Sequence, residues 1–212
     1  MSRFLRVILG ALLVVTLSAL IRGGIGLLRI EQQPRNPIGI PSPPVAASIY
    51  LAPIGTYPQV EADLLVAHYR EKLGLEISVL PPIRVPEEAF DRTREQMIAE
   101  GLIDAIGRTA PAASDPTAIV IGLTSTDMYI AGRDWRYAYS LRAQDRFAVV
   151  STARMGDGLF VDEERRMRRL QKMVTKNLGI LYYRLPQNDD PGSVLNRDIL
   201  GPQDLDRVSE DF

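Results

Sequence analysis

The chain of 212 residues contains no cysteine and a single histidine, His68. The lack of cysteine excludes disulfides, thiolate metal sites and cysteine nucleophiles. One histidine is too few for a metal site built from two or three imidazoles of one chain, and it supports no Ser-His-Asp arrangement. His68 lies among apolar residues of an expected helix, so we interpret it as a structural or surface residue.

Net charge is almost absent as well. The formal value is −1 at pH 7, which gives no reason to expect a nucleic-acid partner. Hydrophobic residues make up 46% of the chain and charged residues 24%, as is usual for a folded protein. The length is sufficient for one domain together with a tail or a membrane anchor.

Residues 1–29 have the features of a membrane-targeting segment. Arg3 and Arg6 precede an uncharged, mostly apolar run at 7–21. A positive start before such a run is typical of a signal peptide or a signal anchor. Because no Ala-x-Ala cleavage site follows, an uncleaved transmembrane helix is favoured. The arginines predict a domain outside the cytoplasm, anchored to the membrane, or secreted if the N-terminus is cleaved.

A proline-rich linker is expected at residues 30–46. Five prolines in this stretch exclude a helix and favour an extended spacer. The spacer would separate the membrane segment from a domain at 47–212.

Strands and helices are expected to alternate along residues 47–212. Apolar, β-branched runs predict strands at 48–52, 75–80, 118–123, 137–141 and 147–151, the third central and the last two joined as a hairpin. Helical spacing predicts helices at 60–73, 94–106 and 162–181, and a shorter helical segment begins at Pro86. Beyond Tyr182 we expect irregular structure. The alternation predicts an α/β domain of two or three layers.

Several segments carry a family resemblance. They are Ser-Ile-Tyr-Leu-Ala-Pro-Ile-Gly at 48–55, Leu-Pro-Pro at 80–82, Arg-Glu-Gln-Met at 94–97, Ile-Gly-Leu-Thr-Ser-Thr-Asp-Met-Tyr at 121–129 and Phe-Ala-Val-Val-Ser-Thr-Ala-Arg at 147–154. In order and spacing they resemble the archaemetzincin family of zinc metalloproteases, over about residues 48–212. The resemblance implies a metzincin/zincin-like α/β fold, a mixed twisted sheet with packed helices, here preceded by the N-terminal apolar helix.

The family signature, His-Glu-x-x-His-x-x-Gly-x-x-His followed by a Cys, a second Cys and a Met-turn methionine, aligns with helix 162–181 and the segment after it. Six aligned positions, which we call the vestigial positions, are Lys176, Asn177, Ile180, Tyr183, Pro186 and Val194. By this resemblance, Lys176, Ile180 and Pro186 replace the histidines. Asn177 replaces the glutamate, Tyr183 the glycine and Val194 the methionine. Gln187 and Gly192 stand where the family has cysteines, whereas Leu-Gly at 178–179 is retained.

These replacements affect the zinc chemistry that the resemblance implies. Zinc needs three neutral imidazoles or equivalent donors, and a glutamate takes the proton from its bound water. Lys176 is a cation at neutral pH, Ile180 and Pro186 donate nothing, and Asn177 lacks basicity. We therefore expect no cofactor in place of the family's zinc, and no catalytic, cofactor-binding or metal-binding residues. Ile180 is expected to fill the former metal pocket as a core residue.

Two functions are left open. The first is a catalytically inactive archaemetzincin-like protein of the cell envelope, a pseudoenzyme that binds a peptide or protein in a vestigial cleft along an edge strand. Its other expected partner is the membrane, through the N-terminal helix. The alternative is a zinc-dependent metallopeptidase that uses non-standard ligands.

Two groups of charges are interpreted as solvated. On helix 162–181 they are Arg165, Arg169, Lys172 and Lys176, for which a surface for anionic lipid or an acidic partner is the alternative. Near the C-terminus they are Asp189, Asp190, Asp198, Asp204 and Asp206, whose spacing fits no calcium loop. Asp127 is expected to cap or turn the chain after the central strand.

Overall fold

A computed structural model describes residue 43 and residues 47–156 and 162–212 of the chain. The expected membrane segment at 1–29 therefore lies outside the described residues, as does the linker at 30–46 apart from Pro43. Among the helices that are described, none is long and apolar enough to cross a membrane.

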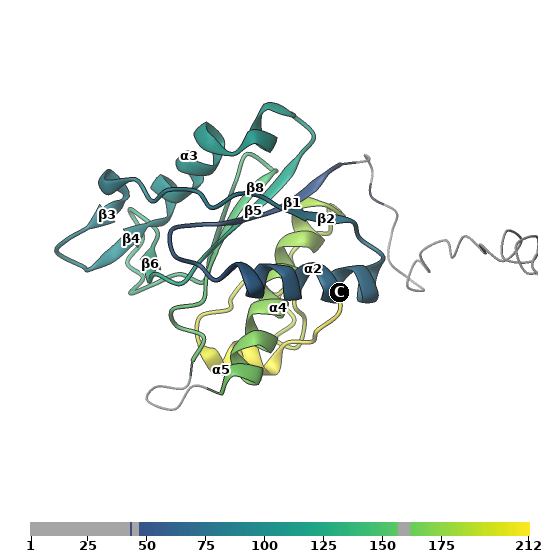
Figure 1. The fold of residues 1–212 in the computed structure, drawn as a ribbon. Coiled ribbons are helices and arrows are strands. Elements are labelled where there is room, and N and C mark those ends of the chain that lie inside the picture. Colours follow the sequence, from purple (N-terminus) through teal and green to yellow (C-terminus); the bar gives the residue numbers. More distant parts are fainter. Residues whose placement is uncertain (1–42, 44–46, 157–161) are drawn as a thin grey trace, which may run out of the picture. The chain divides into compact units, whose positions relative to one another are not determined.

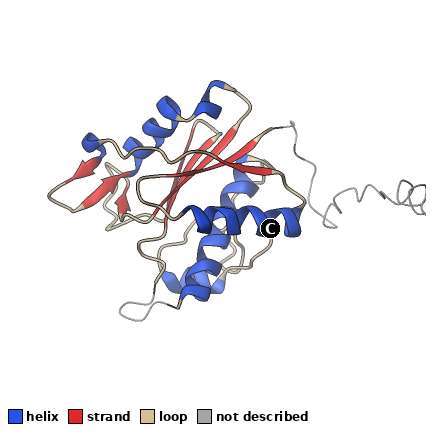
Figure 2. Cartoon of the chain, viewed as in Figure 1, coloured by secondary structure: helices blue, strands red, loops and turns tan. Residues whose placement is uncertain are grey.

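A five-stranded mixed sheet forms the centre of the domain at 47–212 (Figures 1 and 2). Its strands in spatial order are β2 (Ile77–Val79), β1 (Ile49–Pro53), β5 (Ile119–Thr124), β8 (Phe147–Ser151) and β7 (Ser140–Ala143). The first four run parallel, and β7 pairs antiparallel with β8 at one edge. Four expected strands, the central place of β5 and the hairpin are confirmed, whereas the strand expected at 137–141 begins later, as β7 at Ser140–Ala143. Gln144 and Asp145 form the hairpin turn, both with positive φ.

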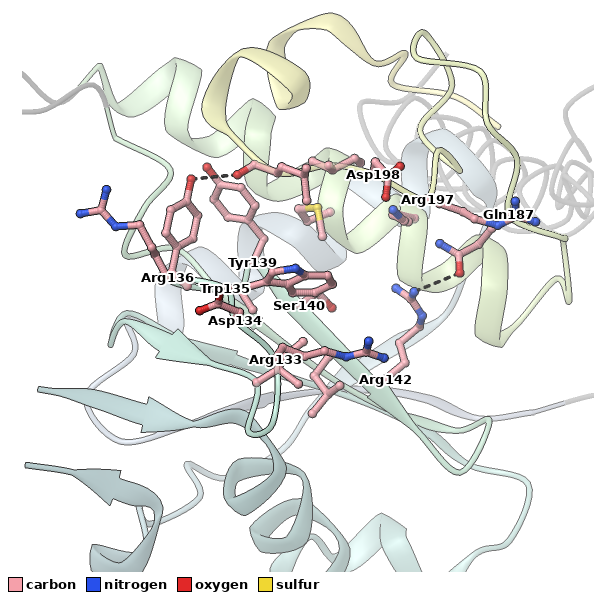
Figure 3. Close-up of a pocket in the computed structure, with 18 residues that line it drawn as sticks. Arg133, Asp134, Trp135, Arg136, Tyr139, Ser140, Arg142, Gln187, Arg197 and Asp198 are labelled. Carbon is pink, nitrogen blue, oxygen red and sulfur yellow. Dashed lines mark hydrogen bonds between the residues drawn. The ribbon is translucent and has the colours of Figure 1, made fainter. Parts of the chain in front are cut away.

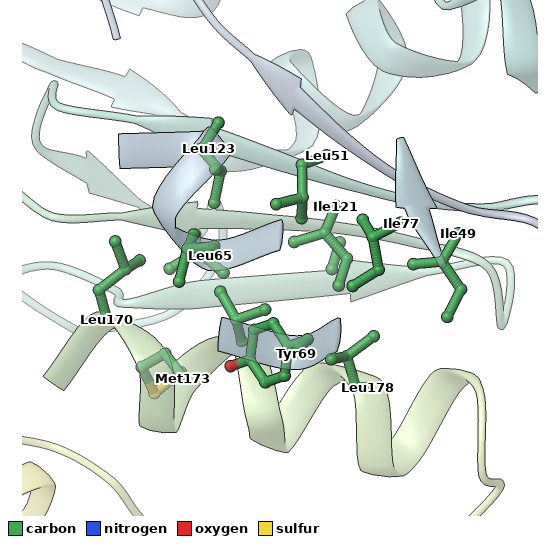
Figure 4. Packing of buried hydrophobic residues seen from close by; sticks show 14 of the residues in the cluster. Ile49, Leu51, Leu65, Tyr69, Ile77, Ile121, Leu123, Leu170, Met173 and Leu178 are labelled. Atoms are coloured by element: carbon green, nitrogen blue, oxygen red, sulfur yellow. The ribbon is translucent and has the colours of Figure 1, made fainter. Parts of the chain in front are cut away.

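Helices cover both faces of this sheet, which makes three layers. Figure 1 shows α2 (Gln59–Leu73) and α4 (Glu163–Leu181) on one face and α3 (Ala99–Thr109) on the other. Two buried apolar clusters fill the spaces between the layers. Because side chains alternate along a strand, Ile121 of β5 joins the α2–α4 cluster and Val120 joins the α3 cluster. Figure 4 shows the first cluster, with Leu65 and Tyr69 of α2 facing Met173 of α4.

The expected helix ends at α2 and α4 are confirmed by their caps. The chain leaves α2 at Gly74, whose φ of 65° is a left-handed conformation that glycine adopts without strain. At the start of α4, the Asp162 side chain accepts a hydrogen bond from the Arg165 amide, 3.0 Å away.

One expected helix starts too early. Residues 94–98 form a turn and the strand β4 (Gln96–Ile98), and α3 begins only at Ala99 and continues to Thr109. β4 belongs to a small second sheet with β3 (Phe90–Asp91) and β6 (Met128–Tyr129). Before β3, the expected helical segment is a single 3₁₀ turn at Glu87–Ala89. The error arises because pairing with β6, a partner remote in sequence, decides the conformation of β4.

Asp127 does more than turn the chain after β5. Its carboxylate accepts from Gln96 Nε2 at 2.8 Å and from Arg154 Nε and Nη2 at 2.9 and 2.6 Å. It therefore joins the small sheet to the loop that follows β8.

The interpretation of the α4 charges as a solvated face is wrong for three of four. Only Arg165 is exposed, whereas Arg169, Lys172 and Lys176 are buried. A helix that we did not expect, α5 (Pro202–Arg207), packs beside α4. Its Asp206 accepts from Arg169 Nε and Nη2 at 2.8 and 2.7 Å, and Lys172 Nζ donates to the Leu205 carbonyl at 2.9 Å.

The expected acidic tail is likewise partly structural. Besides the Asp206 pairing, Asp204 accepts from the amides of Leu200 and Gly201 at 3.1 and 3.0 Å at the start of α5. Asp189, Asp190 and Asp198 are exposed, as expected.

Candidate functional site

A cleft of about 750 Å³ opens beside the edge strand β7 (Figure 3). Its walls are Ile130 and residues 133–142, Met173 and Lys176 of α4, Gln187, and residues 197–200. The rim includes Trp135, whose side chain is largely exposed. The Tyr137 hydroxyl donates to the Leu200 carbonyl at 3.0 Å and links the two walls. The volume is typical of clefts that bind small molecules or short peptide segments.

The edge strand β7 has one free side. Among the described strands it pairs only with β8. Backbone groups of an antiparallel strand point alternately to either side, and the Tyr139 carbonyl accepts from Ser151 in β8. The N–H and C=O groups of Ser140 and Arg142 therefore point to the open side, where an extended chain could pair with them.

Asn177 connects α4 to β7. Its side chain is fully buried, and its amide nitrogen donates to the Met173 carbonyl at 2.8 Å and to Ser140 Oγ at 3.1 Å. Its amide oxygen accepts from Arg142 Nη1 at 3.2 Å. Both ends of the amide are thus bound by the protein, so this side chain orients Arg142 and takes up no proton.

Lys176 contributes a buried ammonium to the cleft. Its residue is 3% exposed, and Nζ donates to the Asn196 carbonyl. Burial, and after it the Arg142 charge, lower the pKa of Lys176 to about 8, with Asp198 acting in the opposite direction. The ammonium is still mainly protonated at neutral pH.

Arg142 is the second cation of the cleft floor. Its guanidinium donates to Asn177 Oδ1 and to Gln187 Oε1, which lies 3.5 Å away (Figure 3). Burial lowers the pKa of Arg142, although an arginine remains charged throughout the ordinary pH range. In the described part of the chain, neither Arg142 nor Lys176 forms an ion pair with a carboxylate.

Only the first two vestigial positions lie at the cleft. Lys176 lines it and Asn177 contacts its wall, whereas Ile180, Tyr183, Pro186 and Val194 are not among the lining residues. Tyr183 and Val194 are core residues, and burial raises the pKa of Tyr183 to about 12. Pro186 is exposed. Ile180 is half-buried, so the expectation that it fills a pocket as a core residue is not met in full.

The retained Leu-Gly pair has a packing reason. Gly179 lies in α4 against the C-terminal segment, and a β-carbon at this position would come within 2.8 Å of the Phe212 ring and 2.9 Å of Leu195. Only glycine fits this approach without displacement of its neighbours.

The side chains at the vestigial positions do not fit a zinc ion. Lys176 is an ammonium that donates a hydrogen bond, the Asn177 amide is bound by the protein, and Ile180 has no donor atom. Across residues 47–156 and 162–212, no three His, Cys, Asp or Glu side chains gather as a metal-binding group. His68 is half-buried in α2, edge-on to the Tyr69 ring, and is not part of the cleft lining.

Ser140, Arg142 and the rim residue Trp135 were not predicted from the sequence as site residues. The signal for Ser140 and Arg142 was their alternation with Leu141 and Ala143, which places two polar side chains on one face of an edge strand. That face was identifiable as facing α4 only once the sheet order was known.

Comparisons with known proteins agree with the resemblance. No protein-family model matches the chain. A curated archaemetzincin from Methanopyrus kandleri is 35% identical over 118 residues, which are 55% of this chain and 62% of that protein. The crystal structure of archaemetzincin from the same species has a TM-score of 0.61 at 27% identity and covers 80% of this chain and 91% of that one.

Two further crystal structures share the fold. Archaemetzincin from Archaeoglobus fulgidus, complexed with malonate, has a TM-score of 0.62 at 22% identity and covers 78% of this chain and 94% of that one. A zinc-dependent peptidase from Methanocorpusculum labreanum has a TM-score of 0.64 at 19% identity. The match covers 78% of this chain and 95% of that one.

These relatives correct the expectation that no cofactor is involved. The relatives are archaemetzincins, and one protein of the same fold is described as a zinc-dependent peptidase. The expectation was wrong because the side chains at aligned positions exclude one arrangement of zinc ligands and not every arrangement. Sequence identity to one curated archaemetzincin, over less than two thirds of its length, and a fold shared with three crystal structures lead to one conclusion: the chain is a homologue of the archaemetzincins and has their fold.

Proposed function

We propose that the domain binds an extended peptide along β7 in the cleft without hydrolysing it. The observation that carries the proposal is the combination of an open strand edge with a bound amide at the position of the general base. Backbone groups of Ser140 and Arg142 can pair with a peptide, and such strand addition needs no metal. Asn177, held by Met173, Ser140 and Arg142, has no means of activating water.

The binding half of the proposal is tested with the full-length protein and a library of N-acetylated, C-amidated hexapeptides, by affinity selection and mass spectrometry. Ser140→Pro removes a backbone donor on the open side of β7, a change that edge strands tolerate. Ser140→Ala is the matched control, because it removes the same hydroxyl but keeps the N–H. We expect selected peptides to bind Ser140→Pro about tenfold more weakly, a loss of one backbone hydrogen bond, and Ser140→Ala nearly normally.

The catalytic half is tested by incubating the same library with the protein, with and without added zinc. We expect every peptide to remain intact. Zinc-dependent cleavage would overturn the proposal and support the second candidate, a metallopeptidase with non-standard ligands. That candidate is favoured by one observation, the zinc-dependent peptidase among the structures of the same fold.

The proposal includes a place in the cell envelope. Its support is the sequence of residues 1–29, where arginines precede an apolar run. Reporter enzymes fused after Pro44 test it. A reporter that works only outside the cytoplasm should be active, and activity of a strictly cytoplasmic reporter would contradict the topology.

A further inference from the structure

The residues that line the cleft carry more positive than negative charges. Five of its lining residues are arginine or lysine and two are aspartate. Most of these charges are on the exposed rim, where water screens them. The two that matter are Arg142, half-buried, and Lys176, almost fully buried, because desolvated charges interact more strongly.

The hydrogen bonds of these two cations are made to neutral groups. Arg142 donates to the side-chain oxygens of Asn177 and Gln187, and Lys176 donates to the Asn196 carbonyl. An ammonium has three donors and a guanidinium five, so donor capacity is left within the cleft. Asp198 also lines the cleft, yet it forms no ion pair with either cation among the described residues.

Two partly desolvated cations that line the same cleft are unfavourable without an anion. The repulsion is evident in Lys176, whose pKa falls with burial and falls further because of Arg142. An anion that entered between them would relieve this repulsion and accept charge-assisted hydrogen bonds from both.

The position of the pair relative to β7 indicates which anion fits. Arg142 belongs to β7 itself, and its side chain projects towards α4, where Asn177 and Lys176 lie. A peptide added along the open edge would project alternate side chains to that same face. One of these side chains, or the end of the peptide, would then reach both cations.

We propose that Arg142 and Lys176 together bind one carboxylate of a peptide that lies along β7. This inference rests on the proposed peptide binding and specifies its ligand as an acidic peptide. Asn177 acts as a positioning residue, because it holds the Arg142 guanidinium from the side opposite the ligand. The carboxylate is either a Glu or Asp side chain or the free C-terminus of the peptide.

The test uses full-length protein and fluorescein-labelled hexapeptides in three matched forms. The first has a central Glu and an amidated C-terminus, the second has Gln in place of Glu, and the third has Gln and a free C-terminal carboxylate. Fluorescence polarisation gives each Kd. If a side chain is recognised, the first form binds about 10- to 100-fold more tightly than the second; if the C-terminus is recognised, the third does.

Protein variants locate the effect. Arg142→Gln and Lys176→Gln should each remove most of the preference for the carboxylate, measured as the ratio of the Kd of the neutral peptide to the Kd of the carboxylate form. Arg136→Gln is the matched control: it removes the same charge from the same cleft, but its side chain is exposed and points away from the others in Figure 3. It should keep the full preference.

The outcomes separate the two proposals. Failure of all three peptide forms to bind at any practical concentration would contradict the proposed function itself. Equal binding of the three forms would leave peptide binding intact and overturn the carboxylate site, and this result needs no variant to fold. A preference that survives both Arg142→Gln and Lys176→Gln, or that Arg136→Gln weakens equally, would also overturn it.

Discussion

Buried cations at the two sides of α4 have opposite surroundings. At the α5 side, Arg169 is buried with a carboxylate of the same chain, since Asp206 accepts two hydrogen bonds from it. At the cleft side, Lys176 and Arg142 have only neutral oxygens as partners among the residues that the structure describes. The fold thus neutralises the buried charge of Arg169 with a carboxylate. Where the same helix borders a cleft, it leaves the charge for a ligand to neutralise.

The largest effect is expected at the neutralised pair. Asp206→Ala should lower the free energy of unfolding by about 3 kcal/mol, because the buried Arg169 guanidinium would lose the two charge-assisted hydrogen bonds that it donates to this carboxylate. This loss is at the low end of the range for removing one partner of a buried ion pair, because the Asp206 side chain is 44% exposed. Urea unfolding measures it, and a loss below about 1 kcal/mol would place this pair with ordinary surface pairs.

The opposite result is expected at the cleft. Lys176→Met should raise the free energy of unfolding by about 1 kcal/mol at pH 7, because it removes a buried charge that pairs with no carboxylate in the described part of the chain. The gain is limited by loss of the hydrogen bond to the Asn196 carbonyl. A loss of more than about 2 kcal/mol in the same urea experiment would show that Lys176 is as structural as Arg169.

The advantage of Lys176→Met should shrink as the pH rises above about 8. The folded chain releases the Lys176 proton near pH 8, whereas the unfolded chain keeps it up to the ordinary value of 10.5. In that window the unfolded state binds more protons, so the stability of the wild type rises with pH. Urea unfolding of the wild type and of Lys176→Met at pH 7.0 and 9.5 gives the difference between their free energies of unfolding at each pH. Groups that titrate alike in both proteins do not affect this difference. A constant difference would contradict the lowered pKa.

The smallest effect is expected at an exposed pair near the same cleft. Arg197 Nη1 lies 2.7 Å from Asp189 Oδ1, but the two side chains are 58% and 79% exposed. Asp189→Asn should change the free energy of unfolding by less than about 0.5 kcal/mol, and less still in high salt. A change as large as that of Asp206→Ala would mean that burial does not explain the contrast between the pairs.

Part of the candidate site could be predicted from the sequence. The resemblance identified α4 as the helix of interest and Lys176 and Asn177 as positions of interest, and both lie at the cleft. It could not identify Arg142, because nothing local distinguishes an edge strand from an interior one. The spacing of charges on α4, which is that of an ordinary amphipathic helix, wrongly predicted that Lys176 lies on a solvated face.

The sequence by itself determined the elements whose signals are local. Apolar runs determined β5 and β8, the spacing of apolar residues and Asp162 determined α4, and Gly74 determined the end of α2. It also determined which chemistry the vestigial positions lack, because side-chain identity sets which groups can bind a metal or take up a proton.

Only the tertiary structure decided which charges are buried and which find partners. α5 is six residues long, too short to be predicted by periodicity, yet it covers Arg169 and Lys172. The antiparallel pairing of β7 with β8 leaves one side of β7 open and turns Arg142 towards Asn177 of α4. Burial depends on segments that are remote in sequence, so the same row of basic residues on α4 became a structural ion pair at one end and a candidate binding site at the other.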